Sequence, residues 1–89
     1  MTKRLLIVAR RYADATLAAR DLELERGQWR YVFRVQSVVG RRATSTAIWW
    51  LDRGRRLDVD TFNYLFLLQH EGAKMFEADE VDAVRAWLE

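Results

Sequence analysis

The chain has 89 residues, a formal net charge of +2, one histidine, no cysteine and no proline, and 51% of its residues are hydrophobic. This length predicts one domain, residues 1–89, with a core limited by the small size of the chain. The missing cysteines exclude disulfides and thiolate metal sites, and a single histidine nearly excludes a structural zinc site. No apolar run is long enough to cross a bilayer and no signal-peptide pattern is present, so we expect a soluble intracellular protein with no membrane partner.

The first part of the chain predicts a strand followed by a helix. Leu5–Ala9 is apolar throughout, which is typical of a strand buried on both faces. From Tyr12 to about Leu22 the sequence is rich in alanine and predicts a helix. The expected sheet-facing residues of this helix are Ala13, Leu17 and Ala18.

After a predicted turn at residues 25–28, the sequence alternates with a period of two. One set comprises Trp29, Tyr31, Phe33 and Val35, and the other comprises Arg30, Val32 and Arg34. Aromatic residues on one face and arginine on the other predict a half-exposed strand at the edge of a sheet.

Residues 47–51 (AIWWL) form a second apolar run and predict a second central strand. A loop rich in arginine follows at residues 52–56. Either Asp58 or Asp60 can cap the next helix, which we expect to end near Glu71 because Gly72 provides a helix stop.

The last part of the chain predicts a short strand at Ala73–Phe76 and a final helix. Asp79 followed by Asp82 is a variant of the capping box and marks the expected start of that helix. Its predicted core residues are Val81, Val84 and Leu88, with Trp87 at the margin.

This order of elements predicts an α/β fold. The first and third strands are apolar on both faces, so they belong in the centre of the sheet, in the order 2-1-3-4. Right-handed crossovers place the first and last helices on one face and the middle helix on the other. We therefore expect a small three-layer, Rossmann-like domain with a four-stranded, mainly parallel sheet and three helices. The link from Val35 to Ser45 is short for a parallel crossover, which leaves an antiparallel third strand as the alternative.

Charge is unevenly distributed along the chain. Residues 1–56 hold 13 of the 15 lysine and arginine residues but only five acids, whereas residues 57–89 hold two cations and eight acids. Thirteen of the 15 cations are arginine. This preference has two explanations, which are the codon bias of a GC-rich genome and the use of guanidinium groups as forks for phosphate or carboxylate.

In open α/β sheets, ligands bind beyond the carboxyl ends of the strands, where the strand order reverses. Here that point lies between the first and third strands. The candidate anion or nucleic-acid-binding residues at this edge are Arg10, Arg11, Arg34, Arg53, Arg55 and Arg56. The junction at residues 9–15 has no glycine, which argues against a bound nucleotide, and we expect no cofactor. Solvated arginines without a ligand are the alternative.

Candidate catalytic groups are few. His70 falls at the end of the middle helix, on the amino side of the sheet and far from the arginines. Glu77, Asp79 and Glu80 could hold a divalent ion, but the positive end of the last helix explains these acids better. The sequence thus predicts that the protein is not an enzyme and has no metal site.

The middle helix is apolar over more of its surface than one sheet can cover. Its expected sheet-facing residues are Val59, Phe62, Leu65 and Phe66. A second apolar set comprises Tyr64, Leu67 and Leu68. Because this second set widens the apolar face beyond about 100°, it is a candidate protein interface, most simply of a homodimer. Coverage of the excess by residues 35–45 is the alternative.

The first half of the chain carries a family resemblance. An Ala-Arg-Arg-Tyr sequence after the apolar strand (Ala9–Tyr12), an alanine-rich helix (Ala13–Arg20) and a Trp-x-Tyr-Val strand (Trp29–Val32) are followed by Gly40–Arg42. Together they resemble small α/β proteins encoded by actinobacterial bacteriophages, which implies a phage accessory protein in the host cytoplasm and transfers no activity. The order of elements is also BRCT-like: it resembles, in topology only, the BRCT domain, which binds phosphopeptides and DNA ends.

Two functional hypotheses follow. The first is a phage-encoded, non-catalytic accessory protein that associates with itself and contacts a host protein. The second is a module that binds nucleic acid or phosphate through the arginine patch. The aromatic and basic stripe at residues 29–34 could stack on bases and so supports the second hypothesis. We expect instead that its aromatic rings are buried in the core.

Overall fold

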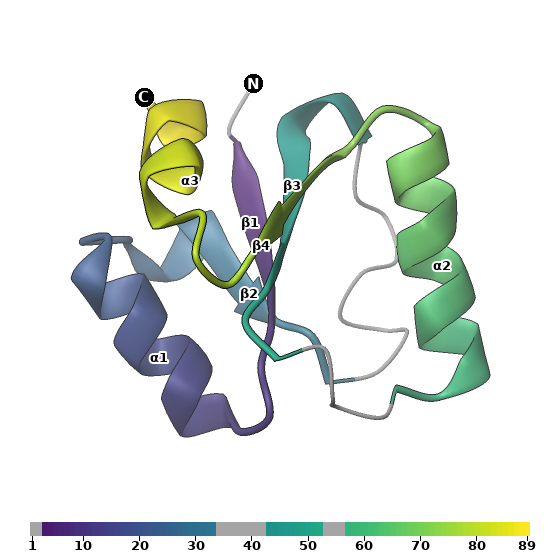
Figure 1. Ribbon diagram of the computed structural model, residues 1–89, viewed down its shortest axis with the longest axis horizontal. Coiled ribbons are helices and arrows are strands. Elements are labelled where there is room, and N and C mark those ends of the chain that lie inside the picture. The colour runs from purple at the N-terminus through teal and green to yellow at the C-terminus, as the bar shows by residue number, and fades with distance from the viewer. Residues whose placement is uncertain (1–2, 34–42, 53–56) are drawn as a thin grey trace.

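The computed structural model describes residues 3–33, 43–52 and 57–89, which contain a four-stranded sheet and three α-helices (Figure 1). The strands are β1 (Arg4–Val8), β2 (Trp29–Tyr31), β3 (Thr46–Trp50) and β4 (Lys74–Glu77). The helices are α1 (Tyr12–Asp21), α2 (Val59–His70) and α3 (Val81–Leu88), and short 3-10 turns precede β2 and β3 at Arg26–Gln28 and Ala43–Ser45.

The sheet has the predicted order β2-β1-β3-β4, and all of its strand pairs are parallel. The third strand is therefore parallel to the first, and the antiparallel alternative is wrong. Leu5 aligns with Trp29 on one side and with Ala47 on the other, which places β1 in the centre of the sheet. Every residue of β3 is buried as well. The two continuous apolar runs thus occupy the positions that require apolar side chains on both faces.

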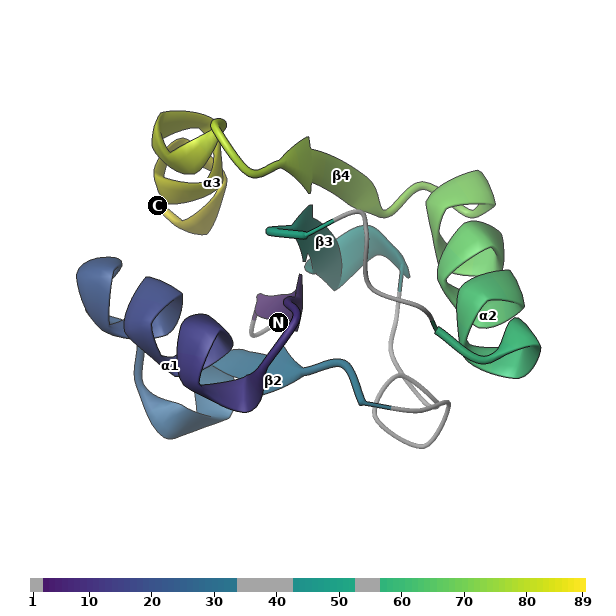
Figure 2. The same cartoon turned by 60° about the horizontal axis from the view of Figure 1, so that its bottom comes forward.

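The two faces of the sheet carry separate halves of the core. On one face, alternate residues of β1 and β3 pack beneath α2 together with Leu65 and Leu68. On the other face, the intervening residues of both strands pack against α1 and α3, through Ala15, Ala19 and Val84. Figure 2 shows α1 and α3 on one side of the sheet and α2 on the other, as the handedness of parallel crossovers predicts.

Helix α1 meets the sheet through small residues, and the predicted stripe is largely wrong. Ala15 and Ala19 are buried, whereas Ala13 is exposed and Leu17 is 55% exposed; Ala18 lies at the margin of the core. Because Ala15 and Ala19 are four residues apart, they share one face of the helix. Their small side chains form the contact of α1 with the core on this face of the sheet.

Helix α2 is rotated relative to the prediction. Asp58 caps it: its carboxylate accepts hydrogen bonds from the Thr61 N–H at 3.1 Å and from the Thr61 hydroxyl at 2.5 Å. Thr61 is fully buried, and this pairing satisfies its hydroxyl within the core. Thr61, Leu65 and Leu68 therefore form the inner face, with Tyr64 packed beside them.

The predicted allocation of α2 residues is thus wrong on both faces. Of the expected sheet-facing residues, only Leu65 is buried, whereas Val59, Phe62 and Phe66 are exposed. Of the predicted interface residues, Leu68 lies in the core, Tyr64 packs against the core, and Leu67 is 48% exposed. Of the predicted interface residues, Leu67 is exposed and Tyr64 is partly exposed, whereas Leu68 is not available to a partner.

Helix α3 begins at a different residue from the one predicted to cap it. Glu80 occupies the N-cap position, and its carboxylate accepts a hydrogen bond from the Glu77 N–H at 2.8 Å, so the capping box proposed for Asp79 and Asp82 is wrong. The predicted core face is confirmed, because Val84 is buried. Around it pack Val81, Trp87 and Leu88. At the other end of α3, the Lys3 ammonium donates to the Trp87 carbonyl at 2.5 Å.

Candidate functional site

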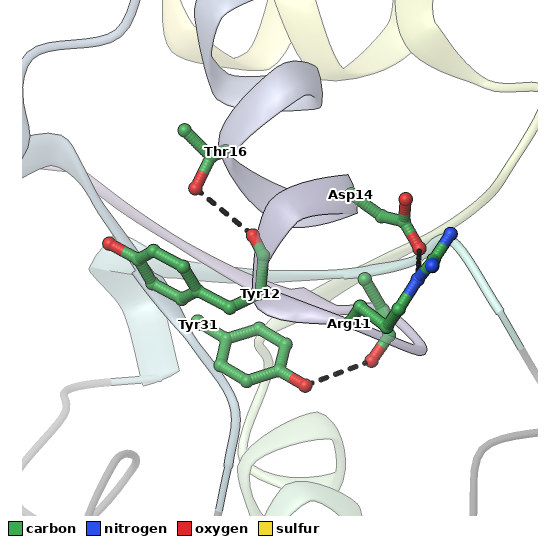
Figure 3. A network of polar contacts seen from close by, with 6 residues as sticks. Arg11, Tyr12, Asp14, Thr16 and Tyr31 are labelled. Atoms are coloured by element: carbon green, nitrogen blue, oxygen red, sulfur yellow. Dashed lines mark hydrogen bonds and ion pairs between the residues drawn. The ribbon is translucent and has the colours of Figure 1, made fainter.

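The predicted arginine patch is described only in part. Arg10 and Arg11 are both exposed and follow the carboxyl end of β1, where the topology was expected to place them. The guanidinium of Arg11 lies 3.6 Å from the carboxylate of Asp14 (Figure 3), and an exposed pair of this kind contributes little to stability. The remaining predicted members, Arg34, Arg53, Arg55 and Arg56, lie outside the described residues.

Four aromatic rings form a row beside this junction, along the edge strand β2. Tyr12 lies 6.1 Å from Trp29 with an angle of 31° between the ring planes, and 5.5 Å from Tyr31 at 86°. The row continues from Tyr31 to Phe33 at 6.4 Å and 32°. All of these separations fall within the range of favourable aromatic pairs. Figure 3 shows the Tyr12 ring beside that of Tyr31.

The two half-buried rings of this row, Trp29 and Tyr31, are held in place by the fold. Trp29 and Tyr31 point to the same face of β2 and are half-buried against the core beneath α1. The Tyr31 hydroxyl donates to the Ala9 carbonyl at 3.3 Å, which ties β2 to the end of β1 (Figure 3). Before β2, the Glu25 N–H donates to the Gln28 side chain at 2.8 Å and orders the preceding turn.

The other two rings of the row are exposed to solvent. Tyr12 and Phe33 are each 61% exposed. The expectation that the core buries the aromatic residues of this stripe is therefore correct in part for Trp29 and Tyr31 and wrong for Phe33. Tyr12 belongs to a different element from the others and joins them because α1 crosses beside β2.

Two hollows adjoin the row and share the Trp29 side chain as a wall. The first, with a volume of about 470 Å³, is lined by Tyr12, Arg26, Trp29, Arg30 and Tyr31. The second, of about 550 Å³, is lined by Thr16, Ala19, Arg20, Glu23, Leu24 and Trp29. We call the two hollows together the aromatic-arginine edge. Two arginines, Arg26 and Arg30, and no acidic residue are among the described residues that line the first hollow.

A second candidate surface lies on the opposite side of the molecule, on the outer face of α2. Phe62 and Phe66 are 46% and 60% exposed, and their rings lie 5.9 Å apart. Together with Asn63, Leu67 and His70 they line a hollow of about 510 Å³. We call these residues, with the exposed Val59, the outer face of α2.

The described part of the chain contains neither a cluster of metal ligands nor a membrane-spanning helix. Within residues 3–33, 43–52 and 57–89, no group of three or more histidine and acidic side chains is arranged to hold a metal ion. The same residues contain no helix that is long and apolar enough to cross a bilayer. Glu77 and Glu80 instead meet through the backbone of the turn before α3.

Comparison with protein-family models, curated proteins and solved structures found no match for this chain. The resemblance to phage proteins therefore stays a prediction. Function has to be inferred from the residues and their geometry.

The sequence pattern did not predict that the residues of the aromatic-arginine edge lie together. The alternation along residues 29–34 places Trp29 and Arg30 in one stripe, but it does not connect Tyr12 and Arg26 with them. A signal was available, because Tyr12 begins the helix that crosses from β1 to β2, on the face toward which Trp29 and Tyr31 point. The right-handed crossover brings these residues together.

Proposed function

We propose that this protein is a non-catalytic accessory protein of a bacteriophage, which acts in the host cytoplasm through protein–protein contacts and associates with itself through the outer face of α2. The phage origin and the location are supported by the resemblance of the first half of the sequence. The interaction role is supported by one structural observation, which is the apolar surface that α2 turns away from the sheet.

The apolar area on this surface is larger than that of a single exposed side chain. Single apolar side chains are common on protein surfaces, but here Val59, Phe62, Phe66 and Leu67 gather on three turns of one helix. With exposed fractions of 46% and 60%, Phe62 and Phe66 alone expose roughly 200 Å². Contiguous apolar patches of a few hundred Å² are often interaction surfaces.

A second copy of the chain fits this face when the two helices lie antiparallel. The middle of the face is uncharged, whereas Asp60 lies near the amino end of α2 and His70 at its carboxyl end. A two-fold axis through the middle brings each acidic end close to the partner's His70 and sets the two helix dipoles in opposite directions. Phe66 then packs against the partner near Phe62.

The expected dimer is weak. A helix of 12 residues is about 18 Å long, so the pair buries less than the roughly 800 Å² per partner of a standard interface. Interfaces at the low end of this scale belong to transient complexes. We therefore expect a dissociation constant in the micromolar range or above. A weak dimer also leaves the same face available to a host protein.

Sedimentation velocity over a series of protein concentrations tests the proposal. We expect the mass to rise from 10.6 kDa toward twice that value as concentration increases. Leu67→Asp should keep the protein monomeric, because it places a carboxylate in the apolar contact. Leu17→Asp is the matched control, since Leu17 is also about half exposed but lies on α1, on the other side of the sheet.

A wild-type protein that stays monomeric at every concentration would refute self-association. Equal loss of the dimer in the Leu17 and Leu67 variants would place the contact elsewhere. A host partner is tested separately, by asking whether Leu67→Asp abolishes co-purification of a host protein that the Leu17 variant retains.

A further inference from the structure

We propose that the aromatic-arginine edge binds single-stranded nucleic acid, with bases stacking on Tyr12 and the exposed part of Trp29 and with phosphates bound by Arg26 and Arg30. This inference goes beyond the proposed function and does not depend on it. The edge lies on the α1 side of the sheet, whereas the outer face of α2 lies on the other.

The rings combine exposure with fixed positions. Tyr12 is 61% exposed, and its ring packs against that of Tyr31, with the ring centres 5.5 Å apart. Trp29 and Tyr31 are anchored in the core on one side, so they lose little conformational freedom when a ligand binds. Stacking on such a ring contributes to binding of any base, because every base has a π face.

The charges of the first hollow suit a phosphate. Arg26 and Arg30 both line it, and a guanidinium can bind two phosphate oxygens at once. The nearest acid along the chain, Glu25, directs its carboxylate to the Gln28 N–H in the turn before β2. No acidic residue that could neutralise the arginines is among the described residues that line this hollow.

The arrangement suits a chain of nucleotides better than a single one. Trp29 separates the first hollow from the second, and the second adds a further arginine, Arg20, beside the acidic Glu23. In the other direction, the row of rings continues past Tyr31 to Phe33. Successive bases and phosphates of one strand can thus meet alternating rings and guanidinium groups. A duplex cannot do so, because its bases are stacked on one another.

Fluorescence anisotropy with a labelled oligothymidylate of twelve nucleotides at low salt tests this inference. We expect saturable binding that Tyr12→Leu weakens about tenfold, the loss typical of one stacked base. Tyr12 is mostly exposed, so this variant should keep the fold, which circular dichroism verifies. Tyr12→Phe retains the ring and should bind as the wild type does.

The arginines are tested through salt dependence. Arg26→Gln and Arg30→Gln should each reduce the slope of log K against log salt by about 0.7, the value for one phosphate contact of a single strand. Arg85→Gln on α3 is the matched control, because Arg85 is exposed and lines neither hollow. An equal change in the slope for all three variants would overturn the assignment of a local site.

A strand of the same length with abasic sites throughout separates stacking from charge. It carries the same phosphates, so binding as tight as that of the oligothymidylate would overturn the proposal, as would equal binding of a duplex. The Leu67→Asp variant should bind the strand as well as the wild type does. Loss of nucleic-acid binding and loss of self-association are therefore distinguishable.

Discussion

The rotation of α2 can be tested by two identical truncations on opposite sides of one turn of the helix. Leu65→Ala removes a side chain that is 1% exposed and packs against β1 and β3, whereas Leu67→Ala removes one that is 48% exposed. The same atoms are deleted in both cases. Any difference in stability therefore reports which face of the helix meets the sheet.

The expected magnitudes differ severalfold. A buried Leu→Ala change costs about 2–5 kcal/mol, against a total stability of about 4–13 kcal/mol for a domain of this length. Leu67→Ala should cost about 1 kcal/mol or less, because about half of that side chain is already in water. If Leu65→Ala costs about 3 kcal/mol, the melting temperature of such a small domain falls by roughly 12–24 °C.

Thermal and urea unfolding followed by circular dichroism measure both values. The protein should be dilute enough to be monomeric, so that Leu67 reports only on the fold of a single chain. Equal destabilisation by the two variants, or a larger effect of Leu67→Ala, would refute the orientation of α2 and with it the proposed interface.

Two further predictions concern charged groups that stabilise helix ends. Hydrogen bonds from Thr61 lower the pKa of Asp58 below its ordinary value of 3.8. The stabilisation from Asp58 is therefore complete above that value and lost as the pH falls through the folded-state pKa. The gap in melting temperature between wild type and Asp58→Ala should accordingly be widest near neutral pH and close in acid; a gap independent of pH would contradict this reading of the cap. Lys3→Met should lower the melting temperature slightly, with a free-energy cost of about 0.3–1 kcal/mol. The reason is that the Lys3 ammonium binds the carbonyls of Trp87 and Glu89 at the end of α3 and lies 5.5 Å from the Trp87 ring. An unchanged melting curve at low salt would show that these contacts contribute nothing to stability.

The strand order and the placement of the helices could be predicted because they follow from strong local patterns. The runs at Leu5–Val8 and Ala47–Trp50 are apolar at every position, which only a central strand of a covered sheet requires. Parallel pairing and right-handed crossovers then leave few choices for the rest. The chemistry of helix caps also limits the cap of α2 to Asp58 or Asp60, and the structure shows that Asp58 is the cap.

The faces of the helices could not be predicted because their sequences contain too many apolar positions. In α2, five successive residues (YLFLL, 64–68) are apolar, so periodicity alone does not select one face. The structure selects the face that buries Thr61, whose hydroxyl is satisfied by Asp58 only after the helix has formed. In α1, alanine competes with leucine for the sheet, and close packing favours the smaller side chain.

The candidate site was predicted in part for a related reason. The position of Arg10 and Arg11 follows from the topology. The row of rings depends on how Tyr12 lies across β2, and this is a tertiary contact between residues that are 17 positions apart in the sequence, Tyr12 and Trp29.

The central place of β1 has a consequence during synthesis. Of the four strands, β1 is synthesised first, and β2 can pair with it once α1 has formed, but its other edge must wait for β3, about 40 residues later. At ordinary translation rates this interval is roughly 2 to 8 s. Throughout it, the nascent chain presents an unpaired apolar strand edge, the kind of surface that other chains can join. The order of synthesis therefore leaves this edge of β1 exposed to other chains until β3 pairs with it.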